Sequence, residues 1–276
     1  MLDAVPIPQM QRTRGRAEVA LVAAPGGARL VRLGQRGSAK AFLPRVHSPV
    51  PEVVFLNTAG GLTGGDRMSF ALELGARARA VATTQTAERA YAASGGVAEL
   101  DVEISVGAGG ALDWLPQETI VFDRSALTRR TEIALAGDAR CLFVETLVLG
   151  RAAMGETVEV LALRDTRRVT RDGVPVLIEP LRLGAQSLAR RQAGAGLAGA
   201  RAVATLALAA PGAEDALGPL RAALAGAEGV RAAASGWDGK CVLRLMADDA
   251  YPLRRALIRA LNALRGGAPL PRVWQM

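Results

Sequence analysis

Apolar and polar residues alternate with a period of two along most of this chain, and this pattern limits what the chain can fold into. In the segment 99–106, every second residue is Leu, Val or Ile, and the residues between them are Glu, Asp or Ser. The segment 68–74 alternates in the same way, and Asp172-Gly173 is a two-residue hairpin signal. Such segments predict half-buried strands joined by turns, and therefore a mainly β fold of many short strands. By the same criteria we predict strands at 16–24, 28–33, 53–56, 111–115, 119–122, 131–135, 141–149, 157–163, 167–171, 174–179, 203–208, 230–235 and 240–246.

One segment towards the C-terminal end, 249–265, has the spacing of an amphipathic helix. Leu residues form a stripe on one face, an Asp before the segment can cap it, and a Gly follows its end. We predict that Arg254, Arg255 and Arg259 face away from the core.

A second, weaker helix is predicted at 214–227, where three Leu residues share one face. Pro219 lies inside this segment and predicts a late start or a kink. The segment 75–93 fits either a strand or one to two helical turns. No Pro- or Ser-rich linker and no repeat of fixed period divides the chain. We therefore expect one domain over residues 1–276, with residues 1–15 as a flexible N-terminal extension.

The composition argues against several classes of protein. No apolar run approaches the ~18 residues of a membrane span, and the first residues contain no apolar stretch typical of a signal peptide. We therefore expect a cytoplasmic protein with no membrane partner. The chain has two Cys residues and one His, His47, so a zinc site or a Ser-His-Asp triad is not expected.

The net charge of +8 raises the alternative of a nucleic-acid binder. However, the Arg residues are scattered along the chain, and only 4% of residues are aromatic, so stacking platforms for bases are scarce. We expect an Arg-rich surface that attracts an acidic protein partner, and no nucleic acid. The segment 194–199 matches G-x-G-x-x-G in letters only, because no strand precedes it, and Gly239-Lys240 lacks the rest of a P-loop.

A glycine-rich segment at 57–67, N-T-A-G-G-L-T-G-G-D-R, has two Gly pairs that permit positive φ. One interpretation is structural: a tight crossing between two strands where backbones approach closely. The alternative is an enzyme or binding protein that uses the loop Gly60–Asp66 to hold an anionic ligand on its backbone N–H groups.

Acidic residues also interrupt apolar runs. Glu145 lies inside an otherwise apolar strand, where a carboxylate is most often paired with a buried Arg. The alternative is a metal or proton path. Its oxygen ligands would bind a transition ion weakly, because no Cys or His cluster supports them. The candidate residues for this path are Asp66, Glu118, Asp123, Glu145 and Glu156.

Four motifs in order along the chain resemble the UreD family of urease accessory proteins, called UreH in some bacteria. They are N-T-A-G-G-L-T-G-G-D-R at 57–67, T-T-Q-T-A-E-R-A-Y at 83–91, W-L-P-Q-E-T-I-V-F-D at 114–123 and L-G-R-A-A-M-G-E at 149–156. The segments R-D-G at 171–173 and P-R-V-W at 271–274 are similar as well. The residues that carry the resemblance are Asn57, Gly60, Gly61, Gly64, Gly65, Asp66, Trp114, Pro116, Gln117, Glu118, Asp123, Gly150, Arg151, Gly155 and Glu156.

The resemblance implies a cytoplasmic maturation factor without catalytic residues. Such a protein is expected to bind the urease apoprotein and a UreF-type accessory protein, which recruits a UreG-type GTPase, for insertion of nickel. It also implies β-sheets that are layered or helically wound, with about two helices towards the C-terminal end. No firmly bound cofactor is expected. Instead, nickel is expected to pass transiently along an internal path. The five carboxylates named above are candidate ligands of this path by their position.

Overall fold

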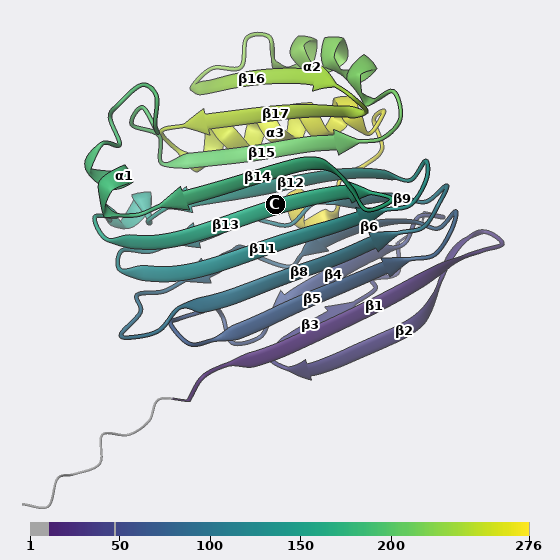
Figure 1. Cartoon of the computed structure of the whole chain (residues 1–276), viewed down its shortest axis with the longest axis horizontal. Helices are drawn as coiled ribbons and strands as arrows, with labels where there is room; N and C mark the ends of the chain where they lie inside the picture. Colours follow the sequence, from purple (N-terminus) through teal and green to yellow (C-terminus); the bar gives the residue numbers. More distant parts are fainter. Residues whose placement is uncertain (1–10, 47, 276) are drawn as a thin grey trace, which may run out of the picture.

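Two facing β-sheets form most of the computed structural model, which describes residues 11–46 and 48–275 (Figure 1). His47 and most of the predicted extension 1–15 lie outside the described residues, and the first strand begins at Arg14. The front sheet contains β1 (Arg14–Ala24), β2 (Gly27–Gly37), β5 (Arg67–Leu74), β8 (Ala98–Val106), β11 (Ser125–Leu135), β13 (Leu161–Arg171) and β14 (Val174–Leu183). The back sheet contains β3 (Ala39–Phe42), β4 (Glu52–Asn57), β6 (Arg79–Thr84), β7 (Glu88–Ala90), β9 (Ala111–Trp114), β10 (Thr119–Val121), β12 (Arg140–Leu149), β15 (Ala202–Ala209), β16 (Val230–Trp237) and β17 (Lys240–Ala247).

From β4 to β13 the chain winds between the two sheets, and we call this part the solenoid. Strands β4, β6, β9 and β12 stack in parallel in the back sheet, and β5, β8, β11 and β13 stack in parallel in the front sheet. Apart from β6 to β7 and β9 to β10, which stay in the back sheet, each connection crosses to the opposite sheet, so parallel neighbours form without helical crossovers. The prediction of a mainly β fold with layered or wound sheets is confirmed.

The solenoid is held by columns of inward side chains at equal register. Leu72 lies beside Ile104 in the front sheet, Ile104 lies beside Ile133, and all three are buried. Burial of one such side chain contributes about 1.5–3 kcal/mol. The sequence shows no fixed repeat because the connecting loops differ in length and only the inward positions recur.

Beyond β12 the back sheet continues with β15, β17 and β16, and helices cover one of its faces (Figure 1). The covering helices are α2 (Leu217–Leu224) and α3 (Ala250–Leu264), whereas the short α1 (Ala185–Ala189) packs against β13 and β14. Turns of 3₁₀ helix lie at Ala152–Met154, Ala213–Ala216 and Arg272–Trp274. A second hydrophobic core lies between α2, α3 and the sheet, and Leu253, Leu257 and Leu261 of α3 pack into it. The Asp249 side chain caps α3 by accepting a hydrogen bond from Tyr251 N at 2.8 Å.

Both helices predicted near the C-terminal end are therefore present, and α2 starts late, as Pro219 predicts. None of the helices within the ranges 11–46 and 48–275 combines the length and the apolar character that crossing a membrane requires.

Strands β11 and β13 of the front sheet run through segments that were not predicted as strand, and buried charges explain why. Strand β13 runs unbroken through the gap between the predicted strands 157–163 and 167–171, while residues 157–160 are not strand. Its inward residues include Asp165 and Arg167, which in the sequence look like turn residues. In β11 the inward Arg129 interrupts the apolar pattern in the same way, so the first half of this strand was not predicted. The ambiguous segment 75–93 forms β6 and β7 without a helix, and α1 was not predicted.

The glycine-rich loop connects β4 in the back sheet to β5 in the front sheet. Gly61 has a φ of 157°, and a Cβ there would collide with the Tyr91 ring and the Arg89 carbonyl. Gly64 has no positive φ, but a Cβ there would collide with the Gly95 carbonyl oxygen. Several loop N–H groups donate to main-chain or side-chain oxygens of the protein itself, which supports the structural interpretation of a close strand crossing.

We predict that Gly61→Val and Gly64→Val each reduce the yield of soluble protein, because the larger side chain forces two backbone segments apart. Gly95→Val is the matched control, since Gly95 is exposed and a Cβ there meets open space. Soluble yield and thermal unfolding by circular dichroism measure the effect. Equal yields for all three variants would contradict the close-packing argument.

Candidate functional site

Four charged side chains are buried inside the last turns of the solenoid. Arg129, Asp165 and Arg167 point inward from the front sheet, and Glu145 points inward from β12 opposite them. Each side chain is at most 5% exposed. In the register of the front sheet, Leu100 lies beside Arg129, so the solenoid interior changes from apolar to ionic between β8 and β11.

Arg129 is the centre of this ionic cluster. Its Nη1 lies 2.7 Å from Glu145 Oε2, and its Nη2 and Nε lie 2.6 Å and 3.0 Å from the two oxygens of Asp165. Nη1 also donates to Thr119 Oγ1 at 2.8 Å. Burial alone lowers the pKa of Arg129, but the attraction of Asp165 and Glu145 is larger, so its pKa is raised. Removing one partner from such a buried pair typically costs about 3–5 kcal/mol.

Asp165 extends the cluster to a second arginine. It accepts from Arg167 as well as from Arg129, and these two cations hold its pKa below the usual value although burial opposes the shift. Arg167 Nη1 lies 3.3 Å from Glu179 of β14, and Arg244 Nε of β17 lies 2.7 Å from the other oxygen of Glu179. A chain of ion pairs therefore connects the solenoid interior to the C-terminal strands.

Glu145 is the one predicted path carboxylate that lies inside the solenoid. Besides Arg129, its Oε1 accepts from Trp114 Nε1 at 3.3 Å and from Thr131 Oγ1 at 3.1 Å. The interpretation of Glu145 as a partner of a buried arginine is confirmed. Both oxygens of this carboxylate have protein partners, which explains why it is tolerated in an apolar strand.

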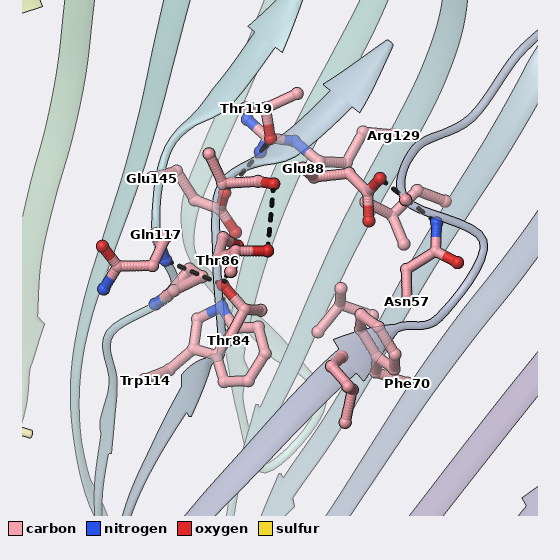
Figure 2. A pocket seen from close by; sticks show the side chains of 16 residues that line it. Asn57, Phe70, Thr84, Thr86, Glu88, Trp114, Gln117, Thr119, Arg129 and Glu145 are labelled. Atoms are coloured by element: carbon pink, nitrogen blue, oxygen red, sulfur yellow. Dashed lines mark hydrogen bonds and ion pairs between the residues drawn. The ribbon is translucent and has the colours of Figure 1, made fainter. Parts of the chain in front are cut away.

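A small cavity of about 40 Å³ lies beside the ionic cluster, and we call it the interior cavity. Its volume is enough for a few water molecules. Figure 2 shows that polar side chains from several strands point into it, opposite the rings of Phe70 and Trp114. The polar residues that line it are Asn57, Thr84, Thr86, Glu88, Gln117, Thr119, Arg129 and Glu145.

Glu88 also lines the interior cavity, and it is a titratable group that does not belong to the ionic cluster. Desolvation raises its pKa to about 7, partly offset by a hydrogen bond from Asn57 Nδ2 at 3.2 Å. The same Asn57 amide donates to the Gly61 carbonyl, which links Glu88 to the glycine-rich loop. A carboxyl with this pKa is divided between its neutral and ionised forms near neutral pH.

The motif pair Gln117 and Glu118 is held from outside the solenoid by helix α3. Arg254 Nη1 lies 2.9 Å from Gln117 Oε1 and 3.4 Å from Glu118 Oε2, and the guanidinium stacks over the Trp274 ring at 4.7 Å. The prediction that Arg254 faces away from the core is therefore wrong. Within the described residues, the buried Nε2 of Gln117 has no hydrogen-bond partner.

Three of the other candidate carboxylates hold loops rather than line the cavity. Asp66 accepts from Thr13 N at 2.7 Å and from Thr63 N at 2.8 Å. Asp123 accepts from two successive backbone N–H groups at 159 and 160, which lowers its pKa. Glu156 accepts from the backbone and side chain of Arg151, and these bonds lower its pKa although burial opposes the shift.

The structure therefore separates the five candidate carboxylates. Glu145 lines the cavity, Glu118 faces α3, and the others lie in loops. Across residues 11–46 and 48–275, no three His, Cys, Asp or Glu side chains lie close enough to form a metal site.

Sequence reasoning missed Glu88, Arg129, Asp165 and Arg167 as parts of the site. Glu88 lies in the quoted motif at 83–91, which was a signal that it could matter. The other three carried no signal, because their strands lie far apart in the sequence and pair only through the fold.

Comparison with known proteins places the whole of this arrangement in one family. A family profile described as "UreD urease accessory protein" matches residues 13–275. A protein named urease accessory protein UreD from Cereibacter sphaeroides is 63% identical over 266 residues, which cover 96% of each chain. Proteins of the same name from Dinoroseobacter shibae and Rhizobium leguminosarum bv. viciae are 56% and 48% identical, covering 98% and 96% of this chain and 94% and 96% of their own.

We predict that Glu145→Gln lowers the free energy of unfolding by roughly 3 kcal/mol, because Arg129 then retains only Asp165 as a charged partner. Glu132→Gln, at an exposed position of β11, the strand that carries Arg129, is the control and should change the free energy of unfolding by less than about 0.5 kcal/mol. Urea unfolding measures both. The double variant with Arg129→Gln should lose at least about 1 kcal/mol less than the sum of the single losses. A Glu145→Gln variant as stable as the control would rule out this role.

We also predict a pH-dependent difference between the wild type and Glu88→Gln. The pKa of Glu88 rises from 4.5 to about 7 on folding, so its stabilising contribution is present below pH 4.5 and is lost as the pH rises through 7. Relative to Glu88→Gln, the wild type should lose roughly 2–3 kcal/mol of unfolding free energy between these pH values. Urea unfolding at a series of pH values checks this, and a pH-independent difference would contradict it.

Proposed function

The chain belongs to the UreD family of urease accessory proteins, and we propose that it acts as a scaffold that binds the urease apoprotein while nickel is inserted. Its role is in urease maturation, as an accessory protein and not as an enzyme. The observation that carries this conclusion is the family match over residues 13–275, which covers both the solenoid and the C-terminal strands and helices.

For the complex, we propose direct binding to the urease apoprotein and to a UreF-type accessory protein, which would bring a UreG-type GTPase. A cytoplasmic location fits this assembly. The proposal includes no nucleic-acid and no membrane partner. The net charge of +8 supports partners with acidic surfaces, because opposite charge speeds the encounter of two proteins.

For the nickel, we propose that Ni²⁺ passes as cargo through the interior cavity. What supports this is the set of oxygen donors around it, from Glu88 and Glu145 to the hydroxyl groups of Thr84, Thr86 and Thr119. Carboxylate, amide and hydroxyl oxygens without thiolates or imidazoles hold a transition ion weakly, which suits transfer better than storage. Glu88 is the carboxylate most open to the ion, because Glu145 is already bound to Arg129.

The experiment compares urease activation in cells that carry the urease genes with and without this chain. We expect that urease is not activated in cells without the chain. We also expect that the urease apoprotein and the UreF-type protein are recovered on the tagged chain. Full activation without the chain would contradict the proposed function.

We predict that Glu88→Gln leaves the yield of the complex unchanged but slows urease activation at low nickel, with recovery at excess nickel. Removing the charge weakens the hold on the ion without removing a buried ion pair. Glu132→Gln, an exposed carboxylate on the outer face of β11, is the matched control. Activation of the Glu88→Gln variant equal to that of the control over the whole nickel titration would exclude Glu88 from the path.

A further inference from the structure

A second and larger hollow lies where the two sheets part. The front sheet ends at β14, while the back sheet continues through β15, β17 and β16. In Figure 1, α1 and the segment that follows it lie at one end of this step, beside β14 and β15. The hollow has a volume of about 720 Å³ and is lined from β14, β15, β17 and residues 186–197, and we call it the cleft.

The cleft has an apolar lining and a basic rim. Leu183, Leu197, Val203 and Met246 contribute apolar surface. The charged lining residues are four Arg, at positions 167, 182, 190 and 244, and one acidic residue, Glu179. Arg167 and Arg244 pair with Glu179. The guanidinium groups of Arg182 and Arg190 form no ion pair and no hydrogen bond among the described residues, so the rim has two uncompensated positive charges.

The sheet face next to the cleft is only partly covered, since Val242 of β17 is buried on that face. Helices α2 and α3 pack on the opposite face, where Ala234, Leu243 and Leu245 are buried. On the near face the residues that alternate with them, Ala233 and Arg244, are exposed. Trp237 is 42% exposed at the end of β16, which is itself the unpaired edge of the back sheet. Trp237 lies at the other end of β16 from the cleft, whereas Arg244 and Met246 line the cleft itself, and Arg and Met are enriched in protein interfaces.

We propose that the cleft is a docking site for a segment of a partner protein that carries apolar side chains interspersed with carboxylates. The apolar lining fits the first kind of side chain, and Arg182 and Arg190 complement the second. A second copy of this chain is a poor occupant, because its net charge of +8 would bring like charge to the basic rim. The inference rests on the proposed function in one respect, namely that the chain works in a protein complex.

The test uses the purified chain and a short fluorescein-labelled peptide of alternating Leu and Glu, with a Leu–Lys peptide of equal length as the control probe. Arg182→Glu/Arg190→Glu reverses the rim charge, and Ala195→Trp fills the cleft at an exposed lining residue without changing charge. Arg29→Glu/Arg36→Glu on β2, at the far edge of the front sheet, is the matched charge control.

We expect the Leu–Glu peptide to bind the wild type and the β2 control equally, and to bind each cleft variant at least about tenfold more weakly. Equal binding to all variants, no binding to the wild type, or equal binding of the Leu–Lys peptide would overturn the proposal. So would a DNA duplex that is retained by the wild type and lost in the rim variant while peptide binding persists.

A second measurement separates this inference from the proposed function. The same variants are co-expressed with the urease apoprotein and the UreF-type protein, and the yield of complex is compared. If the wild type assembles and the cleft variants do not, the cleft is the docking site. If all variants assemble, the inference fails and the proposed function stands. If the wild type does not assemble, the proposed function fails, and the peptide measurement still decides the inference.

Discussion

Charge neutrality inside the solenoid is the constraint on which the last turns of this structure depend. Arg129 cannot be buried between two sheets unless carboxylates surround it, and it receives Asp165 from the neighbouring strand and Glu145 from the opposite sheet. Because one partner comes from each sheet, the pairings fix the distance and register between β11, β12 and β13. An apolar core would tolerate small shifts of these strands, whereas a bidentate pair at 2.6–3.0 Å does not.

The interior cavity and the cleft lie at the two ends of this ionic cluster. Arg129 and Glu145 line the interior cavity, Arg167 and Glu179 line the cleft, and Asp165 joins the two arginines. A partner seated at the cleft would therefore contact side chains that belong to the same network as the cavity. Since a buried network responds as a unit to a change of charge, cavity and cleft are electrostatically linked. The first turns of the solenoid, whose inward columns are apolar, have no such link.

Several polar residues of the family motifs accept hydrogen bonds from backbone N–H groups. Asn57, Asp66 and Asp123 each accept from backbone N–H groups of loops that join the two sheets. A solenoid with irregular loops leaves many loop N–H groups without partners in a strand, and Asn and Asp side chains satisfy them locally. These residues thereby place Glu88, Gln117 and their neighbours around the cavity without entering it.

Local pattern in the sequence determined the strand-rich class, both C-terminal helices and the pairing of Glu145 with an arginine, because alternation, capping and the cost of a buried carboxylate depend on near neighbours. The motifs were also enough to identify the family. Tertiary structure alone decided that β11 and β13 are continuous strands, that Arg129 is the partner of Glu145, and that Glu88 rather than Asp66 or Asp123 faces the cavity. The physical reason is that a charged side chain buried in the core needs an opposite charge, here supplied by another strand distant in the sequence, and the sequence does not show which strands become neighbours.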